Sequence, residues 1–127
     1  MMKNLTGLLV VFAVTLTVGV FTGCNQSTAP PSPLAADQIP VELQKAYSKA
    51  KPEFKDVVQK IGSALQEKDY PGAYGGIQIL FNATEGTKQQ RSVTARAMLT
   101  INQLLQDAQA KGDTKAAAAI QYNKRYK

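Results

Sequence analysis

The sequence contains no histidine and only one cysteine, Cys24. Without histidine, the chain cannot form a Ser-His-Asp triad or a Cys-His nucleophile pair, and it has no imidazole to bind a metal ion. A single cysteine provides neither a zinc site of several thiolates nor a disulfide within the chain. We therefore expect no metal and no cofactor, and a folded part that is stabilised by its apolar core alone.

Acidic side chains are also scarce, with 9 Asp and Glu against 15 Lys and Arg and a net charge of +6. Glu53 and Asp56 share a helix face, but lysines surround them, so we interpret them as solvated surface charges rather than as a catalytic acid pair. Ser48 and Lys51 have the Ser-x-x-Lys spacing of serine penicillin-binding enzymes, whose companion motifs are absent here. The sequence therefore predicts a protein that is not an enzyme.

The one long apolar run lies near the start of the chain, from Leu8 to Phe21, and Lys3 precedes it. This run is too short to span a bilayer comfortably as a mature helix. A positive charge, an apolar run and then small residues are the three parts of an export signal. We therefore interpret residues 1–23 as a signal peptide.

The signal ends in Phe21-Thr22-Gly23-Cys24. This tetrapeptide resembles the lipobox of bacterial lipoproteins, in which a small residue precedes a cysteine that is acylated before the signal is cut. The resemblance implies cleavage between Gly23 and Cys24, and a diacylglycerol with usually an amide-linked acyl chain such as palmitate on Cys24, which anchors the protein in the membrane. Asn25 is not the aspartate that retains lipoproteins in the inner membrane of some Gram-negative bacteria, so the periplasmic face of the outer membrane is favoured. An ordinary secretory signal and a retained transmembrane anchor are the alternatives.

After Cys24 the composition changes. Residues 24–38 are rich in Pro, Ser and Ala and nearly uncharged, which predicts a disordered linker, whereas residues 39–127 are predicted to form one small helical domain. Without residues 1–23, Lys and Arg number 14 against 9 acids, a net charge of +5. For an exported chain, this charge favours anionic lipid or a cell-wall polymer as partner over nucleic acid.

Apolar residues of the predicted domain first recur at helical spacing between Pro40 and Lys68. The stripe keeps its phase across Pro52, so we predict one long helix with a kink at this proline. Its members are Leu43, Tyr47, Ala50, Phe54, Val57, Ile61 and Leu65.

The next segment, from Asp69 to Phe81, is ambiguous. Asp69 is a good N-cap, and the apolar residues fit a short helix, but three glycines weaken it. Ile77, Ile79 and Phe81 also alternate as in a strand. We predict a helix, because one short strand would have no partner elsewhere in the chain.

Two further helices have clear local start signals. Thr87 and Gln90 match a capping box, and a broad apolar face then continues until just before Gly112. Asp113 is a good N-cap for a last helix that ends near Lys124. The sequence thus predicts an all-α fold of three to four helices packed as helical hairpins.

The two predicted hairpin joints resemble each other. Lys68-Asp69-Tyr-Pro-Gly-Ala73 and Gly112-Asp113-Thr-Lys-Ala-Ala117 both place an aspartate four residues before a small residue. This pattern resembles the helix joints of tetratricopeptide-type repeats, in which a small residue lets two helices approach closely. The resemblance implies a row of hairpins, and a small bundle is the alternative, since any helical hairpin with an Asp cap has similar spacing.

Two aromatic groups are candidate binding surfaces. Tyr70 and Tyr74 flank glycines and Pro71, so they could form a flat aromatic face for a peptide or glycan, although we favour packing within the hairpin as the explanation of both rings. The tail contains Tyr126 and Lys127 among further cations, which suits an anionic lipid or polymer, although a solvated helix end would have the same composition.

A small helical lipoprotein that ends in a basic, tyrosine-containing run with a terminal lysine also resembles the major outer-membrane (Braun) lipoprotein. The resemblance implies that Lys127 would be joined covalently to peptidoglycan, although the chain lacks the sustained heptads of that family's coiled coil. Our expectation from the sequence is a membrane-anchored envelope lipoprotein that serves as a non-catalytic protein-binding or assembly module. A structural tether between membrane and peptidoglycan through Lys127 is the alternative.

Overall fold

The computed structural model describes residues 29–126, and the regular secondary structure of this range is entirely helical. The all-α prediction is therefore confirmed. The predicted signal peptide, the predicted lipobox with Gly23 and Cys24, and Lys127 lie outside the described residues. A short 3-10 turn is followed by five α-helices: η1 Ala36–Gln38, α1 Ile39–Ala46, α2 Pro52–Gln66, α3 Tyr70–Asn82, α4 Lys88–Ala110 and α5 Thr114–Arg125. Among these helices, none is long and apolar enough to cross a membrane.

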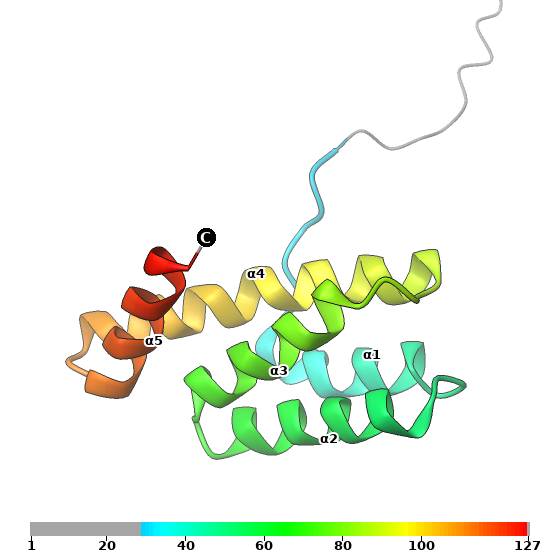
Figure 1. Ribbon diagram of the computed structural model, residues 1–127, viewed down its shortest axis with the longest axis horizontal. Helices are drawn as coiled ribbons and strands as arrows, with labels where there is room; N and C mark the ends of the chain where they lie inside the picture. Colours follow the sequence, from blue (N-terminus) through cyan, green and yellow to red (C-terminus); the bar gives the residue numbers. More distant parts are fainter. Residues whose placement is uncertain (1–28, 127) are drawn as a thin grey trace, which may run out of the picture.

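The first four helices form a closed four-helix bundle (Figure 1). Each helix runs antiparallel to the one before it, and α1 packs against both α2 and α4, while α3 packs against the same two helices from the other side. A row of tetratricopeptide-type hairpins would leave the first helix far from the fourth, so of the two predicted arrangements the small bundle is the one observed. With 23 residues against 8, α4 extends well beyond α1. The last helix, α5, packs on this extension of α4.

Pro52 does not kink one long helix but begins a second one. The first helix ends at Ala46, the chain turns back over residues 47–51, and Pro52 is the first residue of α2. Lys51 is extended, with φ −58° and ψ 150°, as expected because a proline ring disfavours the helical conformation of the residue before it. The predicted number of three to four helices was therefore too low.

The prediction of one kinked helix was wrong because it relied on the unbroken spacing of apolar residues across Pro52. Tyr47 and Phe54 lie on opposite sides of the turn, yet their ring centroids are only 6.4 Å apart. Both α1 and α2 turn their apolar residues toward the same core. The spacing of apolar residues in the sequence is therefore the same for one continuing helix and for two helices joined by a turn.

The predicted linker also ends earlier than residue 38. Leu34 is only 5% exposed and belongs to the core. The Leu34 carbonyl accepts a hydrogen bond from the Thr100 hydroxyl, and Arg96 donates from Nε to the Ser32 carbonyl at 2.9 Å. The average composition of the segment gave no sign that Leu34 is buried. The adjacent prolines restrict the unfolded chain, so they lower the entropy cost of fixing this side chain. The bundle therefore begins at about Ser32.

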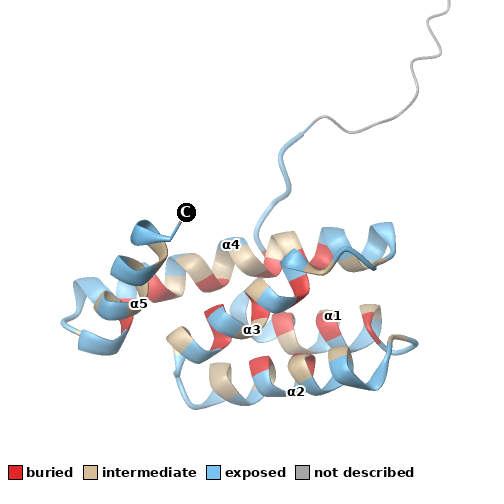
Figure 2. Cartoon of the chain, viewed as in Figure 1, coloured by how far each residue is buried: buried red, intermediate tan, exposed pale blue. Residues whose placement is uncertain are grey.

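The core contains side chains from every α-helix, on the faces that the helices turn toward one another (Figure 2). Among residues 29–126, the buried polar residue is Thr94, whose hydroxyl lies 2.8 Å from the hydroxyl of Tyr47. This hydrogen bond satisfies both groups and joins α4 to the end of α1. The fully buried large side chains are Ile39, Leu43, Ile61, Ile77, Ile101, Leu105 and Thr94.

The predicted helix starts are confirmed. The Asp69 carboxylate accepts a hydrogen bond from the Gly72 amide at 3.1 Å, and Asp113 accepts from two amides of the first turn of α5. The capping box is complete, because the Gln90 amide donates to the Thr87 hydroxyl at 3.1 Å and the Thr87 amide donates to the Gln90 side chain at 3.0 Å.

The two joints that resemble each other in sequence share a backbone geometry. Lys68 and Gly112 both have positive φ angles, 58° and 91°, immediately before the capping aspartate. The Asp69 amide donates to the carbonyl of residue 64, and the Asp113 amide donates equivalently to that of residue 108. These bonds satisfy the last carbonyls of α2 and α4 as in a Schellman motif. The small residue buried after the second joint is Ala116 rather than the predicted Ala117.

Candidate functional site

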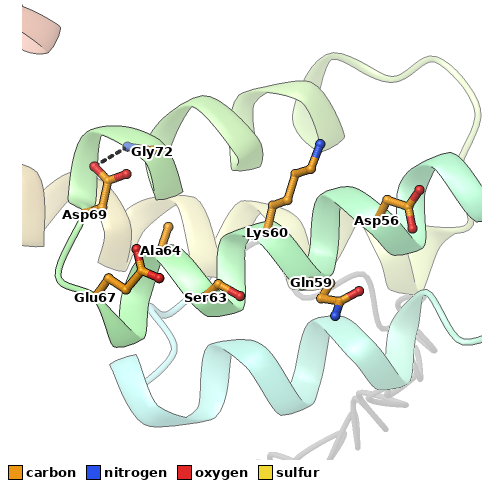
Figure 3. Close-up of a pocket in the computed structure, with 8 residues that line it drawn as sticks. All are labelled: Asp56, Gln59, Lys60, Ser63, Ala64, Glu67, Asp69 and Gly72. Carbon is orange, nitrogen blue, oxygen red and sulfur yellow. Dashed lines mark hydrogen bonds between the residues drawn. The ribbon is translucent and has the colours of Figure 1, made fainter.

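A groove of about 610 Å³ follows the outer face of α2 and the start of α3 (Figure 3). Each of its α2 residues has another lining residue three or four positions away, so they share one face of the helix. The residues that line the groove are Asp56, Gln59, Lys60, Ser63, Ala64, Glu67, Asp69 and Gly72. The groove is open, which suits an extended chain better than an enclosed small molecule.

The charges of this groove are spread along it. Figure 3 shows Asp56 at one end of the row and Glu67 near Asp69 at the other, while Lys60 extends from α2 toward α3. Asp69 is already engaged as the cap of α3. Asp56 and Glu67 therefore do not form a close carboxylate pair, and the described residues contain no group of His, Cys, Asp and Glu that could hold a metal ion.

The Ser-x-x-Lys motif is not arranged as a nucleophile and its base. The Ser48 hydroxyl donates a hydrogen bond to the Lys45 carbonyl at 3.0 Å, whereas Lys51 donates from Nζ to the Glu85 carboxylate at 2.5 Å. The hydrogen bond with Glu85 raises the pKa of Lys51 above its ordinary value. A lysine that accepts a proton from serine needs a lowered pKa instead. Lys51 thus links the α1–α2 turn to the α3–α4 loop.

The predicted aromatic face of Tyr70 and Tyr74 does not form. Tyr74 is 9% exposed and belongs to the core beside Ala73 and Ile77. Tyr70 is half-buried and lines a different groove, together with Pro40 and residues of α2 and α4. The two rings therefore have different surroundings, because the bundle buries Tyr74 among neighbouring helices and leaves Tyr70 at the edge of a groove.

The tyrosine-rich end of α5 is exposed. Tyr122 and Tyr126 are 63% and 73% exposed, and their ring centroids lie 4.5 Å apart with planes at 40°. Lys124 and Arg125 are exposed between them in sequence. The sequence identified this end through its mixture of cations and tyrosines, but it did not identify the groove on α2, because a groove requires two helices side by side.

Compared with known proteins, the chain matches no family model, no curated protein and no solved structure.

Proposed function

We propose that the protein is a lipid-anchored envelope lipoprotein whose helical bundle is a non-catalytic protein-binding module. The observation that supports it most is the docking of Ser32 and Leu34 on α4, because it places the start of the bundle only eight residues after Cys24 in the sequence. Eight residues from Cys24 to Ser32 reach at most about 28 Å when fully extended. An acylated Cys24 would therefore hold the bundle close to the membrane and not at the end of a long spacer.

The groove on α2 is the proposed binding surface. In Figure 1 the N-terminal segment leaves the bundle past α4, while α2 lies on the opposite side of the four-helix ring. An anchor at Cys24 would thus leave the groove facing away from the membrane. Its carboxylates at both ends, Asp56 and Glu67, favour an extended partner segment that carries basic side chains.

A groove-filling substitution tests the binding surface. Ser63 is exposed in the middle of the groove, so Ser63→Tyr is expected to block a partner while the bundle keeps its thermal stability. Gln89→Tyr, on the exposed first turn of α4, is the matched control. Envelope proteins captured by tagged wild-type protein should be lost, by about tenfold or more, with Ser63→Tyr only. Equal capture by both variants would place the binding surface elsewhere.

The anchor has its own test. Cells fed a labelled fatty acid should incorporate it into the wild-type protein and not into Cys24→Ala. Equal labelling of the two, or none in either, would contradict lipidation at Cys24.

The alternative function, a tether to peptidoglycan through Lys127, has less support from the geometry. The N-terminal segment and the end of α5 extend to the same side of α4 in Figure 1, whereas a tether needs its attachment points apart. Deleting Lys127 and measuring retention on purified cell wall discriminates between the two functions, because only a tether loses retention.

A further inference from the structure

We propose that the C-terminal end of α5, formed by Tyr122, Lys124, Arg125 and Tyr126, docks on the anionic lipid headgroups of the membrane that holds Cys24. The proposal rests on the proposed lipid anchor, and it assigns the bundle one orientation on the membrane.

The net positive charge of the described chain is confined to one half of the bundle. Residues 29–82, which include α1, α2 and α3, contain six acidic and six basic side chains. Residues 83–126, which include α4 and α5, contain three acidic and seven basic side chains. An anionic surface therefore attracts the half of the bundle that contains α4 and α5.

The cations at the end of α5 are available for such a surface. The helix Thr114–Arg125 contains no acidic residue. Among the described residues, the one ion pair joins Lys51 to Glu85, so Lys124 and Arg125 have no carboxylate partner there.

The exposed tyrosines suit the same surface. Tyr122 and Tyr126 present two exposed rings, tilted against each other, beside these cations in the sequence. A tyrosine ring has an apolar body and a polar hydroxyl, so it is stable at the level of lipid headgroups, where one part is dry and the other is hydrated.

The anchor and the end of α5 are placed to act together. Arg96 and Thr100 of α4 hold the N-terminal segment, and this segment and the end of α5 both extend beyond α4 on the same side (Figure 1). The tether from Cys24 to Ser32 is at most about 28 Å long. A membrane that holds Cys24 is therefore within reach of α5, and the anchor raises the local concentration of lipid at that helix end.

Tyrosine fluorescence of the acylated protein in vesicles tests the docking, because the chain contains no tryptophan. Three of the five tyrosines are buried or half-buried, so aqueous acrylamide quenches chiefly Tyr122 and Tyr126. With vesicles of phosphatidylglycerol and phosphatidylcholine, quenching should be about twofold weaker than with phosphatidylcholine alone. This protection should disappear in 0.5 M salt, since about 0.5 M salt screens surface charges within a few ångströms.

The double variant Lys124→Gln/Arg125→Gln should abolish the protection, because two surface cations together change lipid partitioning by about thirtyfold. Lys45→Gln/Lys49→Gln removes the same charge from exposed positions in and after α1, and it should leave the protection intact. Equal quenching on both vesicle types, equal loss in both variants, or protection by purified peptidoglycan but not by anionic vesicles would overturn the docking. A protein that does not stay with either vesicle type lacks the anchor, and this outcome contradicts the proposed function instead.

Discussion

At the scale of single residues, Gly75 and Gly76 are neighbours in α3 with opposite surroundings. A Cβ atom on Gly76 would lie 2.6 Å from Cγ1 of Ile61, while one on Gly75 would meet nothing within 4 Å. Gly76 therefore permits the close approach of α2 and α3, which a helix former at this position would prevent. The glycines that made this segment ambiguous in sequence thus have different roles, and only the contact with α2 distinguishes them.

Alanine at these two glycines is expected to change the free energy of unfolding in opposite directions, so each variant serves as the control for the other. Gly76→Ala should lower the free energy of unfolding by about 1–3 kcal/mol, because Ile61 must leave its packed position. Gly75→Ala should raise it by about 0.5–1 kcal/mol, because alanine favours the exposed helix interior. Urea denaturation of both variants measures the two signs, and a loss of stability in Gly75→Ala would contradict the description of α3.

At the scale of elements, the segment before η1 belongs to the folded bundle, although its composition predicted a disordered linker. Leu34 docks on α4 although prolines precede it, and its amide donates to the Arg96 carbonyl at 3.4 Å. The segment is held by one apolar side chain and a few hydrogen bonds, so it is expected to undock more easily than any helix of the bundle.

Leu34→Ala should lower the free energy of unfolding by about 2 kcal/mol and expose residues 29–38 to protease. Leu99→Ala removes the same atoms from a side chain that is 44% exposed on α4, so its cost should stay below about 1 kcal/mol. Limited proteolysis with mapping of the first cleavage site separates the two variants. Equal cleavage in both would mean that Leu34 does not hold the segment.

At the scale of the whole molecule, the absence of histidine determines the response to pH. Carboxyl groups ordinarily titrate near pH 4 and lysines above pH 10, so few side chains change charge between them. The hydrogen bond with Glu85 raises the pKa of Lys51 in the folded protein. Its stabilising effect is therefore fully present below the ordinary lysine pKa and is lost as the pH rises through the raised value.

We therefore expect the free energy of unfolding to be constant to within about 0.5 kcal/mol from pH 6 to pH 8. It should decline only in strongly alkaline solution, and this decline should be slightly smaller in Glu85→Gln, which lacks the ion pair. Denaturation at several pH values measures the profile. A change in the free energy of unfolding with a midpoint between pH 6 and pH 8 would contradict this expectation.

The sequence by itself determined the helical class and the starts of three helices, at Asp69, Thr87 and Asp113. These signals are reliable because each capping hydrogen bond closes within three residues and needs no other part of the fold. The lipobox and the role of Cys24 are likewise conclusions from local residues, and they stay predictions.

Only the tertiary structure decided the turn at Pro52, the docking of Leu34, the burial of Tyr74 and the groove at Ser63. Each of these depends on which helix covers a given face, and a period of 3.6 residues is the same whether the chain continues or turns back. In the bundle, α1 closes the ring against α4, and this contact between distant parts of the chain buries their apolar faces, whereas Tyr122 and Tyr126 at the end of α5 stay exposed.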